Sequence, residues 1–133
     1  MTIAVPRANV VDSSAWLAYF ADEPAAVEFA AAIEDTAALV VPTICLLEVF
    51  KIVTRERGER DALQIAAVMQ QGTVIDLDAE LALSAARVAG KHRLPLTDSV
   101  IYATALRVGG VLWTQDDDFR SLPDVRYVPK TLR

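Results

Sequence analysis

Short apolar runs alternate with longer amphipathic stretches along this chain of 133 residues. Runs of β-branched and other apolar residues predict four buried strands and a fifth, at an edge of the sheet, at 9–12, 39–41, 73–75, 111–113 and 126–128. Apolar residues at helical spacing predict helices between them, at 13–21, after Pro24, and at 43–57, 60–71, 78–89 and 97–108. Alternation of short strands with helices favours a parallel sheet covered on both faces, an α/β fold with three α/β/α layers.

Length and composition narrow the classes of protein further. A chain of 133 residues suits one domain, and it contains no linker, repeat or low-complexity tract. The net charge of −5 argues against general electrostatic attachment to nucleic acid as the main binding device. The single cysteine, Cys45, and the single histidine, His92, exclude cysteine-rich zinc sites and sites that need two imidazoles. Because no membrane segment or secretory signal is recognisable, we expect a cytoplasmic protein.

Acidic residues fall where the predicted strands end. Asp12 directly follows the first apolar run, and Asp116 follows the fourth. Asp98 stands in the first turn of the helix that we expect Thr97 to cap. Parallel pairing places the carboxyl ends of all strands at one edge, which is where sites form in such sheets. We therefore expect these three carboxylates to face the same edge.

Glu48 is unusual because its neighbours from Ile44 to Phe50 are otherwise apolar, and an isolated buried charge is very costly. Each carboxylate also has a purely structural interpretation. Asp12 can cap a helix, Asp98 can interact with a helix dipole, Glu48 can pair with Lys51, and 116–118 can form a surface turn. Taken together, converging carboxylates repel one another unless a cation lies between them. Oxygen ligands without histidine or cysteine select a hard ion, Mg²⁺ or Mn²⁺.

Four segments of the chain resemble the motifs of PIN-domain ribonucleases, and most closely those of VapC-type toxins of bacterial toxin–antitoxin pairs. The segments cover most of the chain in order: NVVDSSAWL at 9–17, LLEVF at 46–50, LPLTDSVIYATA at 94–105 and LWTQDDDF at 112–119. The resemblance implies one PIN-like nuclease domain over residues 1–133 with a parallel α/β/α fold. It also implies metal-dependent endonucleolytic cleavage of RNA and inhibition by a small antitoxin. The family is usually a homodimer whose antitoxin lays its C-terminal segment over the acidic pocket.

The resemblance also assigns roles to residues. The catalytic acidic set is Asp12, Glu48, Asp98 and Asp116, with Asp118 at a more variable acidic position, and Ser13 and Thr114 at supporting hydroxyl positions. On the hypothesis of metal-assisted hydrolysis, Asp12, Asp98 and Asp116 hold Mg²⁺, whereas Glu48 ligates a metal or orients the attacking water. Asp117 falls at a position of no fixed type and is left out of the site.

Two other interpretations remain open. A phospho-receiver-like signalling domain also uses carboxylates and Mg²⁺ at a sheet edge, but it needs a late lysine, and no lysine lies between His92 and Pro129. A catalytically silent PIN-like interaction module is the second. Basic residues near helix ends, at 51–60 and 91–93, either stabilise helix dipoles or contact RNA phosphates.

Overall fold

The computed structural model describes residues 7–130. Its centre is a sheet of five parallel strands in the order β3–β2–β1–β4–β5. The strands are β1 (Asn9–Val11), β2 (Leu39–Pro42), β3 (Thr73–Ile75), β4 (Val111–Thr114) and β5 (Val125–Tyr127). The predicted parallel sheet is confirmed, and it is parallel throughout.

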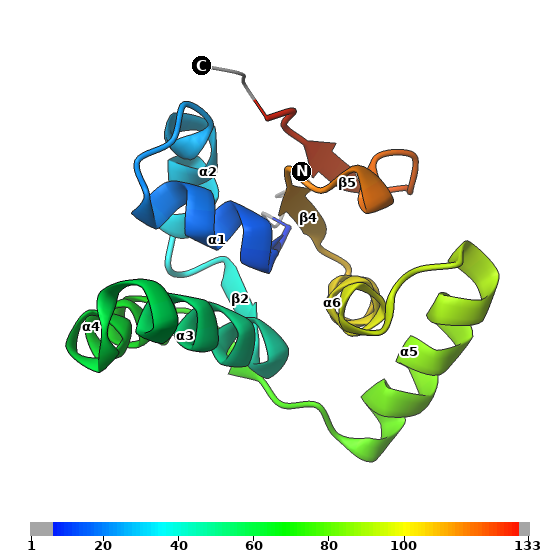
Figure 1. Cartoon of the computed structure of the whole chain (residues 1–133). Coiled ribbons are helices and arrows are strands. Elements are labelled where there is room, and N and C mark those ends of the chain that lie inside the picture. Colours follow the sequence, from blue (N-terminus) through cyan, green and yellow to red (C-terminus); the bar gives the residue numbers. More distant parts are fainter. Residues whose placement is uncertain (1–6, 131–133) are drawn as a thin grey trace, which may run out of the picture.

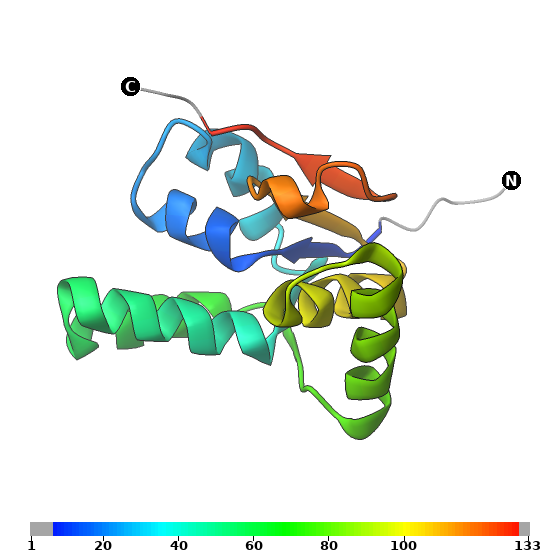
Figure 2. The same cartoon turned by 45° about the vertical axis from the view of Figure 1, so that its right-hand side comes forward.

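Helices cover both faces of this sheet, as predicted for three α/β/α layers. They are α1 (Ser13–Phe20), α2 (Ala26–Ile33), α3 (Thr43–Arg57), α4 (Glu59–Met69), α5 (Ala79–His92) and α6 (Leu96–Arg107). A short 3₁₀ helix, η1 (Asp117–Phe119), follows β4. Helices α1 to α4 lie on one side of the sheet, and α5 and α6 lie on the other (Figures 1 and 2). No helix within residues 7–130 has the length and apolarity needed to cross a membrane.

Several element boundaries differ from the prediction by one to three residues, and three of them have a clear local cause. Helix α6 begins at Leu96 with Pro95 as its N-cap, and not after Thr97, because proline has no N–H group that a helix start would leave unpaired. Helix α4 ends at Met69, two residues early, since the Gln70 backbone N–H already closes the last turn. Strand β5 begins at Val125 because Leu112 N–H donates a hydrogen bond to the carbonyl of Asp124.

The core lies on both faces of the two central strands, which explains why these strands are continuously apolar. Val10, Val11 and Val41 are fully buried in β1 and β2. Trp16 of α1 is fully buried on one side of the sheet, and Ile101 of α6 is almost fully buried on the other. Well-packed helices on each face therefore hold the strand ends in fixed positions.

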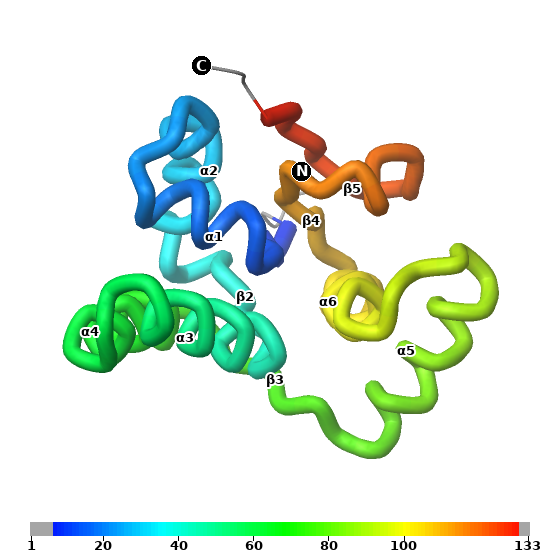
Figure 3. Tube along the Cα trace, viewed as in Figure 1, coloured from blue at the N-terminus to red at the C-terminus, as the bar shows by residue number. Residues whose placement is uncertain are grey.

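The carboxyl edge of the sheet is where the functional residues gather. Strand β1 pairs with β4 through Val11 and Trp113, so the residues that follow each strand emerge side by side. Helices α1 and α3 start at this edge, and α3 contacts both α1 and α6. In Figure 3 the first turns of α1, α3 and α6 surround the end of the central strands. The fold thus brings together segments that are far apart in the sequence.

Candidate functional site

Asp12 lies at the end of β1 and is only 2% exposed. It is the N-cap of α1: its Oδ1 accepts hydrogen bonds from the backbone N–H of Ala15 at 2.9 Å and from the hydroxyl of Ser14 at 2.8 Å. Its Oδ2 accepts a hydrogen bond from the Thr114 hydroxyl at 2.7 Å. The structural interpretation of Asp12 as a helix cap is therefore correct, and the same side chain also ties α1 to β4.

Burial raises the pKa of Asp12 to about 6, because water no longer solvates the charged form. The hydrogen bonds from Thr114, Ala15 and Ser14 act in the opposite direction, and the negative charge of Asp116 adds to the rise. Three donors thus compensate only part of the cost of placing this carboxylate inside the protein.

A chain of hydrogen bonds continues from Asp12 through the end of β4. The Thr114 hydroxyl, which donates to Asp12, accepts a hydrogen bond from the backbone N–H of Asp116 at 2.9 Å. Asp116 caps η1, since its Oδ1 accepts from the backbone N–H of Asp118 at 2.9 Å. The position of each of these carboxylates is therefore set by its neighbour.

Asp98, in the first turn of α6, completes a group of three carboxylates. Asp98, Asp116 and Asp118 each offer an oxygen atom, and these atoms lie within 4.8 Å of one another. Burial, followed by the charge of Asp116 and the close approach of Asp118, raises the pKa of Asp98 well above its usual range. Within residues 7–130, no lysine or arginine forms an ion pair with any of the three.

Glu48 reaches the same edge from α3. Its Oε1 accepts a hydrogen bond from the Ser13 hydroxyl at 2.6 Å. The alternative pairing with Lys51 is not formed in the described part of the chain. Buried Cys45 lies one turn before Glu48, and the charges of Asp12, Glu48 and Asp98 all add to the rise that burial causes in the pKa of its thiol. These three carboxylates therefore surround the same short stretch of α3.

The structure thus brings the four predicted carboxylates to one edge. The three carboxylates that lie together are, however, not the three that the sequence predicts as metal ligands. The trio of closest oxygens contains Asp118 and leaves out Asp12, whose two oxygens are already engaged. Sequence reasoning missed Ser14, although a hydroxyl two residues after a capping aspartate is a usable signal. It also left out Asp117, whose Oδ1 accepts a hydrogen bond from the Tyr127 hydroxyl at 2.5 Å.

The donor set fits a hard divalent cation. All candidate ligand atoms are carboxylate oxygens, which Mg²⁺ and Mn²⁺ prefer over nitrogen and sulfur. A cation at the trio would neutralise the repulsion that raises the pKa of Asp98. The half-buried position of Asp98 and Asp116 leaves room for water and a phosphate in the remaining coordination positions.

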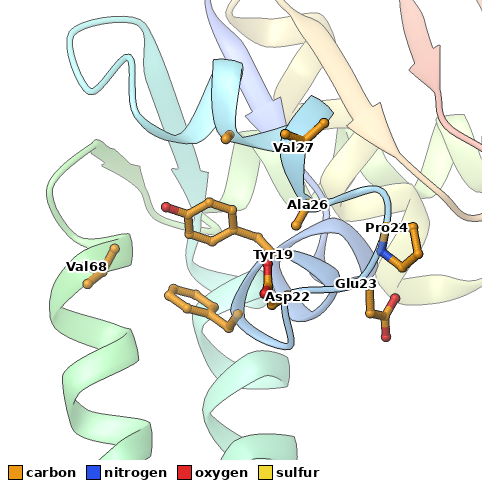
Figure 4. A pocket seen from close by; sticks show the side chains of 9 residues that line it. Tyr19, Asp22, Glu23, Pro24, Ala26, Val27 and Val68 are labelled. Carbon is orange, nitrogen blue, oxygen red and sulfur yellow. The ribbon is translucent and has the colours of Figure 1, made fainter.

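A second hollow lies away from the carboxylates, at the other end of α1. Its volume is about 800 Å³, and Tyr19 and Phe20 of α1, Val27 of α2 and Val68 of α4 contribute most of its apolar lining. Figure 4 shows Tyr19, Val27 and Val68 around the hollow, with Asp22 and Glu23 in the turn between α1 and α2. We refer to it below as the α1–α2–α4 hollow.

Several solved structures share this fold. A toxin–antitoxin complex from Klebsiella pneumoniae contains a chain with 18% identity and a TM-score of 0.78; the match covers 93% of this chain and 100% of that one. VapC20 of Mycobacterium tuberculosis, a sarcin–ricin-loop-cleaving toxin, is 21% identical with a TM-score of 0.75 over 92% and 100% of the two chains. DNA-bound VapBC from Salmonella typhimurium is 15% identical with a TM-score of 0.71 over 92% and 98%.

Sequence comparison identifies the family. No curated protein sequence matches the chain. The family model of the PIN domain matches residues 10–125, a span that runs from β1 into β5 and contains every carboxylate described above. The chain therefore belongs to the PIN domain family.

Proposed function

We propose that this protein is an Mg²⁺-dependent endoribonuclease that cleaves RNA phosphodiester bonds and acts as the VapC-type toxin of a toxin–antitoxin pair. The observation that carries the proposal is the convergence of Asp12, Glu48, Asp98 and Asp116 at one sheet edge. Asp118 strengthens it, because it completes a trio of carboxylate oxygens without a cationic partner in the described residues. On this proposal the whole chain, 1–133, is one PIN-like nuclease domain.

Each carboxylate has a distinct role in this mechanism. Asp98, Asp116 and Asp118 would hold the ion, since each offers a carboxylate oxygen within 4.8 Å of the others. Asp12, the third ligand in our sequence hypothesis, would support the ion less directly, because its own oxygens accept three protein hydrogen bonds. Mn²⁺ can replace Mg²⁺ at such an oxygen site.

A divalent ion held here supplies positive charge that neutralises the phosphodiester and makes a nearby water easier to deprotonate. Glu48 orients the attacking water from the α3 side, and the hydroxyl of Ser13 fixes its carboxylate at 2.6 Å. Thr114 plays the corresponding part for Asp12, since its hydroxyl donates to that carboxylate, and it also accepts from the backbone N–H of Asp116. The hydroxyl residues thus position the acids and take no part in bond breaking.

Partners follow from the same proposal. The solved structures of similar fold include toxin–antitoxin complexes, which supports a cognate antitoxin that inhibits this protein. We place one antitoxin contact at the α1–α2–α4 hollow, because an apolar helix face fits a hollow lined by Tyr19, Val27 and Val68. We further propose a homodimer in the cytoplasm. Light scattering of the purified protein would test the dimer.

The decisive experiment compares Asp98→Asn with wild type in an RNA cleavage assay. Asparagine preserves the shape of the side chain but removes its charge. We therefore expect the rate of cleavage to fall by at least about 100-fold, which is more than the fall caused by loss of a residue that only supports a ligand. Asp76→Asn is the matched control, because Asp76 also follows a strand but is exposed and lies outside the trio. Chelation of divalent ions should abolish cleavage by wild type and by the control alike.

Other results would favour the other interpretations. If Asp98→Asn cleaves like wild type, the acidic edge is not the site of hydrolysis. If wild type binds its antitoxin but cleaves no RNA in any panel of structured RNAs, the protein is a silent interaction module. Uptake of phosphate from a small phosphodonor such as acetyl phosphate would support the phospho-receiver alternative.

A further inference from the structure

A cavity of about 450 Å³ adjoins the acidic edge on the side of Asp116. Its lining comes from three segments: the first turn of α1, the residues after β4, and the residues around the end of β5. The sheet creates it, because Thr114 pairs with Tyr127 in parallel register and Val128 N–H donates to the carbonyl of Thr114 at 2.8 Å. The residues after the two strands therefore emerge next to each other, with a space between them.

Gln115 is the unusual member of this lining. It is only 7% exposed, and within residues 7–130 its side-chain amide forms no hydrogen bond. The amide is not among the buried polar atoms that lack a partner in the described residues, so it still contacts solvent where Gln115 borders the cavity. A ligand in the cavity can therefore replace water at this amide and form hydrogen bonds with it.

The remaining lining residues define the chemistry of that ligand. Lys130 is exposed and forms no ion pair in the described part of the chain, so it can bind an anion. Tyr127 provides an aromatic wall, and its hydroxyl holds one oxygen of Asp117, which leaves the other oxygen as an acceptor. An amide, a carboxylate oxygen, an aromatic ring and a cation together match a nucleotide better than a peptide side chain.

We propose that this cavity binds one nucleotide of the RNA strand next to the scissile phosphate, and that Gln115 reads its base. The proposal rests on the proposed ribonuclease function and adds a specificity-determining residue to it. The Gln115 amide both donates and accepts, as in the bidentate contact of glutamine with adenine. Asp117 accepts from an exocyclic amino group, so the cavity favours adenine, cytosine or guanine over uracil. Lys130 pairs with a phosphate on the same strand.

Cleavage of an RNA library tests the base preference. The substrate is an oligonucleotide with randomised central positions. At one position beside the cut, we expect wild type to cleave RNA with uracil less efficiently than RNA with the other bases, on the order of tenfold. Gln115→Leu should weaken that preference at that position only, since Asp117 remains to accept from an exocyclic amino group. Gln115→Glu, which keeps the size of the side chain, should change the preference without unfolding the protein. Gln64→Leu, an exposed glutamine of α4, is the matched control and should keep the wild-type pattern.

Binding to RNA that is not cut provides a second readout, independent of activity. In an Asp98→Asn background, labelled oligo(A) should bind more tightly than oligo(U), and Gln115→Leu should reduce the difference. Lys130→Gln should weaken both equally and reduce the slope of log affinity against log salt by about 0.7, as expected for one lost phosphate contact on a single strand. Arg87→Gln on α5, outside this lining, should leave the slope unchanged.

The outcomes separate this proposal from the function on which it rests. If wild type cleaves RNA and Gln115→Leu keeps the same base preference, the cavity does not read a base although the nuclease function stands. If wild type cleaves no RNA, the nuclease function fails, and the oligo(A) and oligo(U) affinities still decide the cavity. If the Gln115 and Lys130 variants bind RNA normally but bind the antitoxin weakly, the cavity belongs to the antitoxin and the proposal is wrong.

Discussion

The carboxyl edge of the sheet and the α1–α2–α4 hollow share one helix but differ in chemistry. The first turn of α1 carries Ser13 and Ser14 beside the acidic residues, and its last turn carries Tyr19 and Phe20 beside the hollow. These turns are about 10 Å apart along a helix of eight residues. The acidic edge gathers carboxylates beside the first turn of α1, which Asp12 caps. The hollow exposes aromatic and aliphatic side chains beside the last turn.

The two regions require different ligands. The acidic edge contains Asp98 and Asp12, whose pKa values are raised because burial and neighbouring charge oppose ionisation. Only a cation or a proton relieves that cost. The hollow has no such charge cost; its apolar surface, such as Val27 at 79% exposed, gains free energy when a partner removes it from water. We infer that the acidic edge is tuned to an ion, whereas the hollow is suited to an apolar partner surface.

Asp12 is the residue that could break this comparison, because it caps the helix that both regions share. Asparagine at position 12 keeps the oxygen that accepts from Ala15 and can still bond to Thr114. Alanine leaves three donors without a partner. We expect Asp12→Ala to be about 3 kcal/mol less stable to urea than Asp12→Asn, from the lost cap and the unpaired groups. Equal stabilities would mean that the Asp12 hydrogen bonds do not hold α1 in place.

The pH dependence of stability without divalent ions sharpens the same point. The pKa of Asp12 rises from 3.8 in the unfolded chain to about 6 in the folded protein, so the folded state binds the extra proton between these values. Its contribution is therefore fully present below about pH 4 and is lost as the pH rises through 6, which amounts to about 3 kcal/mol. Urea unfolding in chelator from pH 4 to 8 measures this, and Asp12→Asn should flatten the decline.

Added Mg²⁺ should stabilise the acidic edge by linkage. At a concentration 100 times the dissociation constant, one bound ion adds about 2.7 kcal/mol to the free energy of unfolding. Asp98→Asn should melt at a higher temperature than wild type in chelator, because it removes like-charge repulsion, yet it should gain less from Mg²⁺. Differential scanning fluorimetry measures both effects, with Asp76→Asn as the control. Equal Mg²⁺ shifts in all three proteins would show that the trio shares no ion.

The sequence predicts the sheet and the acidic edge because both follow from local patterns. A short apolar run that ends in an aspartate marks a buried strand and its carboxyl end at the same time, as at Asp12. Parallel pairing then gathers the ends of β1 and β4 without any information about side chains. Glu48 is recognisable because a charge in an apolar run demands a special environment.

The sequence cannot predict the features that depend on side-chain geometry across the fold. Asp118, and not Asp12, belongs to the trio, because Asp116 caps η1 and accepts from the backbone N–H of Asp118, which keeps the two residues together. Gln115 becomes buried only because β5 pairs with β4 beside it. The α1–α2–α4 hollow forms because Tyr19 and Val68, which lie on successive crossover connections, come together. The periodicity of neither helix indicates that these two side chains meet.

Val27→Asp has the smallest expected effect on stability and tests the hollow directly. Because Val27 is 79% exposed, the change should alter the free energy of unfolding by no more than about 0.5 kcal/mol. RNA cleavage and the Mg²⁺ shift should stay as in wild type, since the acidic edge is at the other end of α1. Binding of the cognate antitoxin should weaken at least tenfold, because a buried unpaired carboxylate is costly in an apolar interface. Calorimetric titration with the antitoxin measures this.

The matched control is Val74→Asp on β3, which lies outside the hollow and should leave antitoxin binding unchanged. Unchanged binding to the Val27 variant would place the antitoxin on another surface, and of the two ends of α1 only the acidic edge would keep an assigned ligand.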